Sequence, residues 1–509
     1  MLPVTDTSSS SPDRPIKKPK TPPKLLSLSP SSSTSDFSKP SLFTFSLLHN
    51  HPRSCLLLFV LLLQLLLLSF SGHRPVSLTA TSAPFSVAIV NPYTYSNSIS
   101  PNPSPNSEEC ELGRIFVYDL PPKFNSDIYK NCDNLSPWGS RCAALSNDGF
   151  GTKSTGINRI MPEKLAEVWY NTDQFASEII FHNRLLSHKC RTLNPQSATA
   201  YYIPFYAGLA VGKYLWSDYT PKQRDHHCKT VLKWVESEYP YFNRSNGWDH
   251  FLTMGRITWD FRRSKDHDWG SKCIHLPLMR NITRLLIEKN PWDYFDIGVP
   301  YPTGFHPKNP SDVVLWQDFV KSRERHSLFC FAGATRGTIV NDFRGVLLSQ
   351  CKNSSESCRV VDCGGNKCVN GTSEILETFL DSEFCLQPRG DSFTRRSIFD
   401  CMLAGSIPVF FWRRSAYYQY QWFLPGEPGS YSVFIHRDEV KNGTLVKNVL
   451  EKFSKEEVKK MREKVVEFIP KFIYAKPYEG LGTVKDAVDV AVDGVLKRIK
   501  DQKEFNYKW

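Results

Sequence analysis

Short apolar runs alternate with helical patterns along most of this chain, and this alternation limits the possible fold more than any other feature. Runs rich in β-branched and aromatic residues are typical of buried strands, whereas apolar residues every three or four positions are typical of helices. Their alternation predicts parallel sheets covered by helices on both faces. The predicted strands are Arg114–Asp119, Ala200–Phe205, Ser327–Ala332, Ser406–Phe411 and Tyr431–Ile435.

The length of the patterned region bounds the number of domains. The chain has 509 residues, 40% of them hydrophobic, so it can bury a large core and is neither wholly disordered nor fibrous. The patterned region begins near Cys110 and is too long for one sheet. We therefore predict two α/β domains that face each other, with a boundary in the Gly- and Pro-rich stretch 298–310.

Three helical patterns stand out. Residues 163–186 carry apolar side chains at helical spacing, with a predicted break near Asn171. Ser454 and Glu457 match a capping box, in which each side chain bonds the other residue's backbone N–H, and they predict the start of a helix. Residues 484–499 repeat valine at helical spacing, which predicts a final amphipathic helix.

The amino-terminal region is organised differently. Residues 1–53 are rich in Ser, Pro and Lys, which predicts a disordered tail. Residues 54–72 contain the run CLLLFVLLLQLLLLSF, which predicts a short transmembrane anchor. A cleaved signal peptide is the alternative, but such peptides occupy about the first 30 residues. Basic residues precede the run, so we expect a cytosolic tail, a lumenal stem over 73–109 and a single-pass type II topology.

The cysteines and glycosylation sequons fit a lumenal chain. The chain has 14 Cys, and all but Cys55 follow the apolar run, so at least one is unpaired or bonds another chain. Cys358, Cys363 and Cys368 lack the Cys-x-x-Cys spacing of zinc sites, which favours local disulfides. The candidate N-glycosylation sites are Asn134, Asn243, Asn281, Asn353, Asn370 and Asn442.

The segment 384–411, FCLQPRGDSFTRRSIFDCMLAGSIPVFF, is the most informative for chemistry. It predicts a strand, a loop, a helix that begins near Phe393 and ends at Gly405, and a second strand, which together form a βαβ unit. Ligands of open α/β sheets bind beyond the carboxyl ends of strands, where helices begin. Hydroxyls and arginines there suit a diphosphate, and an acid one turn further suits a ribose diol. These residues are Ser392, Thr394, Arg395 and Arg396 for the diphosphate, and Asp400 for the ribose.

Other interpretations remain for the charged residues. Arg395 and Arg396 equally fit a solvated helix surface, with Asp400 paired to one of them. The motif Asp266-His267-Asp268 is typical of metal sites in sugar transferases, but it follows a basic stretch instead of a hydrophobic strand, which favours a solvated loop. The net charge of +12 is mild for this length, and a lumenal topology separates the chain from nucleic acid.

Aromatic residues and carboxylates gather in the segment 247–263, GWDHFLTMGRITWDFRR. Sugars have apolar C–H faces and polar rims, so aromatic faces beside carboxylates suit a carbohydrate acceptor. A sugar hydroxyl also needs a general base to become a nucleophile. For His250, a buried structural role fits as well as catalysis. The candidate acceptor-binding residues are Trp248, Asp249 and Trp259, and the candidate bases are His250 and Asp260.

Four segments of the chain form a recognisable set: residues 113–125 (GRIFVYDLPPKFN), 247–263, 328–336 (LFCFAGATR) and 384–411. Together they resemble glycosyltransferase family 47, the exostosin-like family, and in particular its plant xyloglucan galactosyltransferase branch. The resemblance covers the chain from Cys110 to about Ile499. It implies a GT-B fold, with two Rossmann-like domains facing across a cleft. Residues 110–310 would form the acceptor-side domain, and residues 311–509, including the final helix, the nucleotide-sugar domain.

The resemblance also implies the reaction. A Golgi enzyme of this branch adds β-galactose from UDP-galactose to O2 of a xylosyl side chain of xyloglucan, with inversion and without a metal or other cofactor. The expected base is Asp260 or His250, and the expected partners are the polymer, the Golgi membrane and other xyloglucan-synthesising transferases. The length is most similar to enzymes that act on the second xylosyl position. The residues implied to line the donor site, besides those above, are Gly333, Arg336, Arg389, Gly390 and Asp391.

Two alternatives remain open at this stage. The first keeps the chemistry and changes the sugar to galacturonic acid or the acceptor to another xylosyl position. The second, from a different class, is a non-catalytic polysaccharide-binding scaffold of a Golgi complex. The arginine-rich loop argues against the scaffold, because a protein that only binds polysaccharide needs no diphosphate site.

Overall fold

The computed structural model describes residues 110–137, 139–216, 218–335, 342–364, 372–390 and 392–507. The predicted tail, anchor and stem lie outside the described residues, and so do Arg336, Asn370 and Asp391. Within those ranges, no helix is both long enough and apolar enough to cross a membrane.

The first parallel sheet lies in residues 115–298. Its strand order is β2-β1-β3-β4-β5-β6, and all neighbouring strands are parallel. The strands predicted near residues 114 and 200 are confirmed, while β4, β5 and β6 were not predicted. Helices α5 and α6 contact β4. The strands are β1 (Ile115–Val117), β2 (Arg191–Thr192), β3 (Ala200–Tyr202), β4 (His250–Ile257), β5 (Thr283–Glu288) and β6 (Asp296–Gly298).

The second parallel sheet lies in residues 327–434, in the order β11-β10-β9-β7-β8. Numbered along the chain, this is the order 2-1-3-4-5, so the sheet reverses direction between β7 and β9. The three strands predicted for this part, and the strand at Phe384–Gln387, are confirmed. The strands are β7 (Ser327–Gly333), β8 (Cys358–Asp362), β9 (Ser382–Gln387), β10 (Ile407–Phe410) and β11 (Val433–Phe434).

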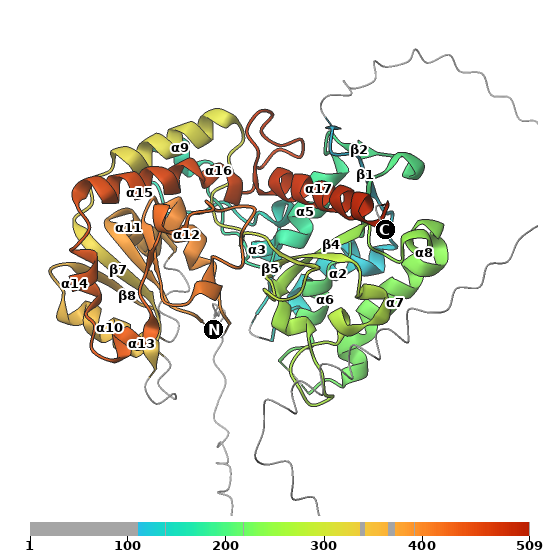
Figure 1. Ribbon diagram of the computed structural model, residues 1–509, viewed down its shortest axis with the longest axis horizontal. Helices are drawn as coiled ribbons and strands as arrows, with labels where there is room; N and C mark the ends of the chain where they lie inside the picture. Colours follow the sequence, from blue (N-terminus) through green and yellow to red (C-terminus); the bar gives the residue numbers. More distant parts are fainter. Residues whose placement is uncertain are drawn as a thin grey trace, which may run out of the picture. The chain divides into compact units, whose positions relative to one another are not determined.

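Helices cover both faces of the second sheet (Figure 1). Successive side chains of a strand point to opposite faces. Phe329 and Phe331 pack with residues of α10, α13 and α14, whereas Cys330 between them packs with residues of α11 and α12. An α/β fold with two parallel sheets is therefore confirmed. The helices around this sheet are α9 (Pro310–Ser322), α10 (Phe343–Asn353), α11 (Thr372–Leu380), α12 (Ser397–Leu403), α13 (Arg437–Lys441), α14 (Val446–Leu450), α15 (Lys455–Glu467) and α16 (Ile469–Phe472).

The remaining helices lie mostly in the first half of the chain, and two of them are separated by the break that the sequence predicts near Asn171. The pattern over 163–186 forms two helices, and the chain between them is not helical. The capping box of Ser454 and Glu457 is present at the start of α15. The helices are α2 (Ser126–Lys130), α3 (Cys142–Leu145), α4 (Glu163–Ala166), α5 (Ser177–Leu186), α6 (Ala207–Gly212), α7 (Pro221–Glu238), α8 (Pro240–Ser245) and α17 (Ala487–Tyr507).

The final helix α17 is amphipathic as predicted, and it contacts β3 of the first sheet. A buried ionic network attaches the start of the helix to α5. The Arg184 guanidinium, 1% exposed, donates to Asp486 at 3.1 Å and to Asp489 at 3.2 Å. The sequence analysis assigns this helix to the second domain, but its contacts include the first sheet. The domain boundary at residue 310 stays a prediction.

Disulfides connect the described cysteines. The pairs are Cys110–Cys190, Cys132–Cys142, Cys228–Cys273, Cys351–Cys358 and Cys385–Cys401. Cys363 is also disulfide-bonded. Cys330, buried in β7, is free, in agreement with the odd number of cysteines after the apolar run. Cys358, one of the three closely spaced cysteines, forms a local disulfide with Cys351, which was not part of that prediction.

Candidate functional site

The loop after β9 lies where a ligand of this type of sheet is expected. In a doubly wound sheet, ligands bind at the carboxyl ends of the two strands between which the order reverses. Here those strands are β7, which ends at Gly333, and β9, which ends at Gln387. The structure therefore brings Gly333, Arg389 and Gly390 to one edge of the sheet. We call residues 388–396 the donor loop.

The helix after this loop begins later than predicted. The sequence predicts a start near Phe393, but α12 begins at Ser397 and ends at Leu403, with Gly405 in the left-handed region at φ 69°. Residues 392–396 are an irregular turn because the side chain of Ser392 and the backbone N–H of Thr394 bond another part of the chain. The groups of this segment that could contact a ligand are therefore side chains and amides of the loop, and not the first turn of a helix.

Arginines and aromatic rings surround the donor loop. The Arg395 guanidinium lies against Gly390, so a Cβ at this position would displace that side chain. The Arg389 guanidinium lies 5.2 Å from the centre of the Phe393 ring. Arg414, which follows β10, lies 5.2 Å from the same ring and 4.1 Å from the Trp292 ring. Arg414 is not among the site residues that the sequence predicts, although Arg413 and Arg414 lie shortly after a buried strand.

Arg396 and Asp400 pair with each other, as the second interpretation of their sequence allows. The Arg396 Nε lies 3.2 Å from an Asp400 oxygen. The Arg396 Nη1 donates to the carbonyl oxygen of Thr172 at 2.6 Å and so links the donor loop to the chain between α4 and α5. Both side chains remain partly exposed. Arg396 therefore has a structural task besides any contact with a ligand.

Glu288, the last residue of β5, holds the donor loop from the first sheet. Its Oε2 accepts hydrogen bonds from the Ser392 hydroxyl at 2.5 Å and from the Thr394 amide at 2.9 Å. Burial raises the pKa of Glu288 to about 7, against the opposing effect of these hydrogen bonds. Glu288 is not among the site residues that the sequence predicts. The available signal was an acid that ends the apolar run Leu285–Ile287.

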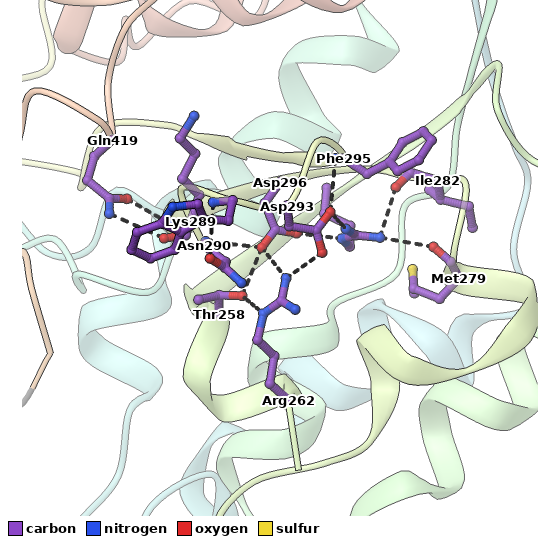
Figure 2. A network of polar contacts seen from close by, with 12 residues as sticks. Thr258, Arg262, Met279, Ile282, Lys289, Asn290, Asp293, Phe295, Asp296 and Gln419 are labelled. Atoms are coloured by element: carbon purple, nitrogen blue, oxygen red, sulfur yellow. Dashed lines mark hydrogen bonds and ion pairs between the residues drawn. The ribbon is translucent and has the colours of Figure 1, made fainter. Parts of the chain in front are cut away.

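A buried network fixes the segments around Glu288 (Figure 2). Asp296, in β6, accepts hydrogen bonds from Arg284 at 2.6 Å, Arg262 at 2.6 Å, Thr258 at 2.9 Å and the Asn290 amide at 3.1 Å. Asp293 accepts from the same two arginines, both at 2.7 Å. Figure 2 also shows Gln419, whose side chain bonds the backbone of Lys289. The network joins the turns after β4 and β5 to the chain after β10.

The predicted acceptor cluster is divided by β4. His250 begins this strand and is fully buried. Its Nδ1 lies 2.6 Å from Asp249 Oδ1 and its Nε2 lies 2.7 Å from the Tyr118 hydroxyl. Trp248 and Asp249 lie beside it, and Asp249 also accepts from the Ser245 hydroxyl. This arrangement favours the structural role for His250 and Asp249.

Trp259 and Asp260 lie beyond the other end of the strand. At about 3.3 Å per residue, the strand separates them from His250 by roughly 23 Å. Trp259 is 62% exposed, and Trp292 in the turn after β5 is 67% exposed. Asp260 is buried and accepts hydrogen bonds from Arg256 at 2.6 Å and Trp269 at 2.8 Å. Of the two candidate bases, only Asp260 lies at the carboxyl edge with Glu288.

The Asp266-His267-Asp268 segment forms an exposed turn. Asp266 pairs with Arg263 at 2.8 Å, and Asp268 accepts from the Ser264 hydroxyl and the Lys265 amide, both at 2.8 Å. No group of metal-binding side chains occurs among the described residues. Four of the described sequon asparagines are exposed, whereas Asn281 is half-buried and its side-chain amide donates to the Asn246 carbonyl oxygen at 3.2 Å. The exposed ones are Asn134, Asn243, Asn353 and Asn442.

Residues 109–453 match the Exostosin GT47 domain, so the chain belongs to the exostosin GT47 family of glycosyltransferases, as its motifs predict. Three Arabidopsis thaliana proteins are similar to it. Xyloglucan galactosyltransferase XLT2 is 68% identical over 403 residues, which cover 79% of this chain and 78% of that protein. Xyloglucan galactosyltransferase MUR3 is 42% identical, covering 77% and 63%. Xyloglucan-specific galacturonosyltransferase 1 is 39% identical, covering 77% and 58%.

Proposed function

We propose that this protein is an inverting galactosyltransferase that adds β-galactose from UDP-galactose to O2 of a xylosyl side chain of xyloglucan. The observation that carries the proposal is the 68% identity to a xyloglucan galactosyltransferase over 79% of the chain. Identity to the galacturonosyltransferase is 39%, which makes galactose the preferred sugar. The second xylosyl position remains our proposed acceptor site.

The donor is proposed to bind at the donor loop. Arg389 and Arg395 lie beside the switch point of the second sheet, and charge-assisted hydrogen bonds to phosphate are about twice as strong as neutral ones. The ribose would bind near Asp400, and Gly333 lies at the end of β7, where a Cβ would come within 3.0 Å of the Arg344 guanidinium. When the C1–O bond to UDP breaks, the guanidinium groups stabilise the charge that develops on the leaving diphosphate.

The acceptor is proposed to approach from the turns after β4 and β5. The exposed rings of Trp259 and Trp292 offer apolar faces to sugar rings. Asp260 is the proposed base: it accepts the proton of the xylosyl O2 as this oxygen bonds C1 of galactose and UDP departs from the opposite face. One displacement inverts an α-linked donor to a β-linked product without a covalent intermediate.

The cellular setting is proposed from the sequence. We infer a GT-B arrangement of the two sheets, a single-pass type II anchor over residues 54–72 and a lumenal catalytic part in the Golgi. The paired cysteines support an oxidising compartment. We also propose that the reaction requires no metal, so that transfer continues in excess chelator; loss of transfer under chelation would refute this.

A linkage-resolved product assay tests the proposal. The purified full-length protein is incubated with a xylosylated glucan oligosaccharide and either UDP-galactose or UDP-galacturonic acid. We expect one added hexose, β-linked to O2 of xylose, from UDP-galactose alone. Transfer of galacturonic acid or a different linkage would replace the proposed reaction. If neither sugar is transferred and UDP-galactose does not bind, the non-catalytic scaffold gains support.

A further inference from the structure

Glu288 occupies the neutral hydrogen-bond donors that the donor loop would offer to a diphosphate. The Ser392 hydroxyl and the Thr394 amide are assigned to the donor's phosphates, but both bond Glu288 Oε2. An ionised carboxylate and a diphosphate at the same two groups repel each other in a buried site, where charge interactions are strong. When the donor binds, either the carboxylate must take up a proton or the diphosphate must give up these two hydrogen bonds.

The surroundings of Glu288 leave its ionised form poorly compensated. Asp260 lies close enough to raise its pKa further, and Arg256 is engaged by Asp260. Burial keeps the neighbouring tyrosines neutral, since it raises their pKa well above the usual range. The charged or titratable groups around Glu288 and the adjacent Tyr301 are Asp260, Arg256, Arg395, Tyr301 and Tyr420.

We propose that Glu288 is a positioning residue for donor binding: in its protonated form it holds the Ser392–Thr394 turn beside the diphosphate, and in its ionised form it competes with the diphosphate for that turn. This inference rests on the proposed function. The carbonyl oxygen of a protonated Glu288 still accepts a hydrogen bond from the turn, and its O–H donates to a phosphate oxygen. Each donor molecule that binds the ionised form therefore takes up one proton from solvent.

The pKa of about 7 for Glu288 puts this exchange near neutral pH. If the ionised form excludes the donor, the apparent Kd is constant well below this pKa and rises tenfold per pH unit above it. UDP-galactose should then bind about tenfold more weakly at pH 8 than at pH 6. Its pyrophosphate is a diester that does not titrate in this range, so the change reports the protein.

Glu178 provides a matched control. It is also a buried carboxylate whose pKa is raised to about 7 by burial. Its partners are the backbone amides of Gly208, Leu209 and Gly255, all in the first part of the chain and none in the donor loop. Glu178→Gln therefore removes a carboxyl group with a similar pKa and leaves the groups that are assigned to the donor unchanged.

The experiment is calorimetric titration of the full-length protein with UDP-galactose at pH 6 and pH 8. Wild type and Glu178→Gln should lose about tenfold in affinity between the two pH values. Glu288→Gln should bind equally at both, because its amide oxygen still accepts from the turn and carries no charge. At pH 8, wild type should take up close to one proton per donor, measured in two buffers of different ionisation enthalpy.

The outcomes separate the two proposals. If wild type does not bind UDP-galactose at either pH, the proposed function fails. If it binds with the same Kd at both, or if Glu288→Gln keeps the wild-type dependence, only the inference about Glu288 is refuted. If Glu288→Gln does not fold, the proton count of wild type decides, and an uptake of zero contradicts the proposal.

Discussion

Loss of the Asp296 charge should destabilise the protein and disturb the site. Two carboxylates, Asp293 and Asp296, neutralise two guanidinium groups, Arg262 and Arg284, and Asp296 is 1% exposed. Asp296→Asn keeps the shape but leaves one uncompensated positive charge in the interior. Removing one partner of a buried ion pair typically costs about 3–5 kcal/mol. Because Asp293 still neutralises one arginine, we expect a value near the lower end, about 3 kcal/mol.

The same substitution should reduce transfer. Asp296 bonds Thr258 and the Asn290 amide, and so fixes the turns that carry Trp259, Asp260 and Glu288. A displacement of about 1 Å at reacting groups can cost about a hundredfold in rate. Urea unfolding measures the loss of stability, and the initial rate of galactose transfer measures the loss of activity.

Asp266→Asn is the control for this prediction. Asp266 also pairs with an arginine, but its side chain is 88% exposed. An exposed carboxylate contributes little to stability, and the buried Arg263 keeps its ion pair with Asp225 at 2.6 Å, so this variant should unfold and react as wild type does. If Asp296→Asn is as stable and as active as Asp266→Asn, the reasoning about the buried network is wrong.

Three further predictions follow from buried or crowded groups. The contribution of Glu178 to stability should fall by up to about 3 kcal/mol as pH rises from about 4.5 to 7, because burial raises the pKa of this carboxyl to about 7 and the folded state then binds more protons. Glu288 acts in the same sense in wild type and in Glu178→Gln, so the urea midpoint of the variant should still depend on pH, with a smaller slope than that of wild type. Gly390→Ala displaces the Arg395 guanidinium and should raise the KM for UDP-galactose at least tenfold. The control is Gly426→Ala, whose added methyl group enters open space and should leave the KM unchanged. Equal KM values in the two variants would contradict the close contact. Cys385→Ser removes the disulfide between β9 and α12 and should lower the free energy of unfolding in urea by about 3 kcal/mol. An unchanged midpoint would show that this disulfide does not stabilise the fold.

The parts of the fold that the sequence predicts are those with a strong local signal. The strands β7, β9 and β10 are apolar on both faces, and the capping box at Ser454 marks the start of α15 without tertiary information. β4 escaped prediction because its residues include histidine, threonine and arginine, whose polar groups are satisfied by distant partners. The Nε2 of His250, for example, lies 2.7 Å from the Tyr118 hydroxyl, at a sequence separation of 132.

The candidate site has a local sequence signal on one side only. The donor loop is continuous in sequence, so its arginines are visible as one motif. Glu288 contacts this loop from more than 100 residues away, at a separation of 104 from Ser392, and no local pattern contains that pairing. Proximity in sequence also misleads: His250 and Asp260 are close along the chain, but an extended strand carries them to opposite ends.

The central claim is that the donor loop binds the diphosphate of UDP-galactose, and a binding measurement tests it most directly. Calorimetry compares wild type with Arg389→Met/Arg395→Met and with the control Arg159→Met/Arg280→Met, which loses the same charge at exposed sites. Hydrogen bonds to charged groups contribute about 1.5–3 kcal/mol each, so the first variant should bind at least about a hundredfold more weakly, and the control should bind as wild type does. Equal affinity for UDP-galactose in all three proteins would contradict the claim.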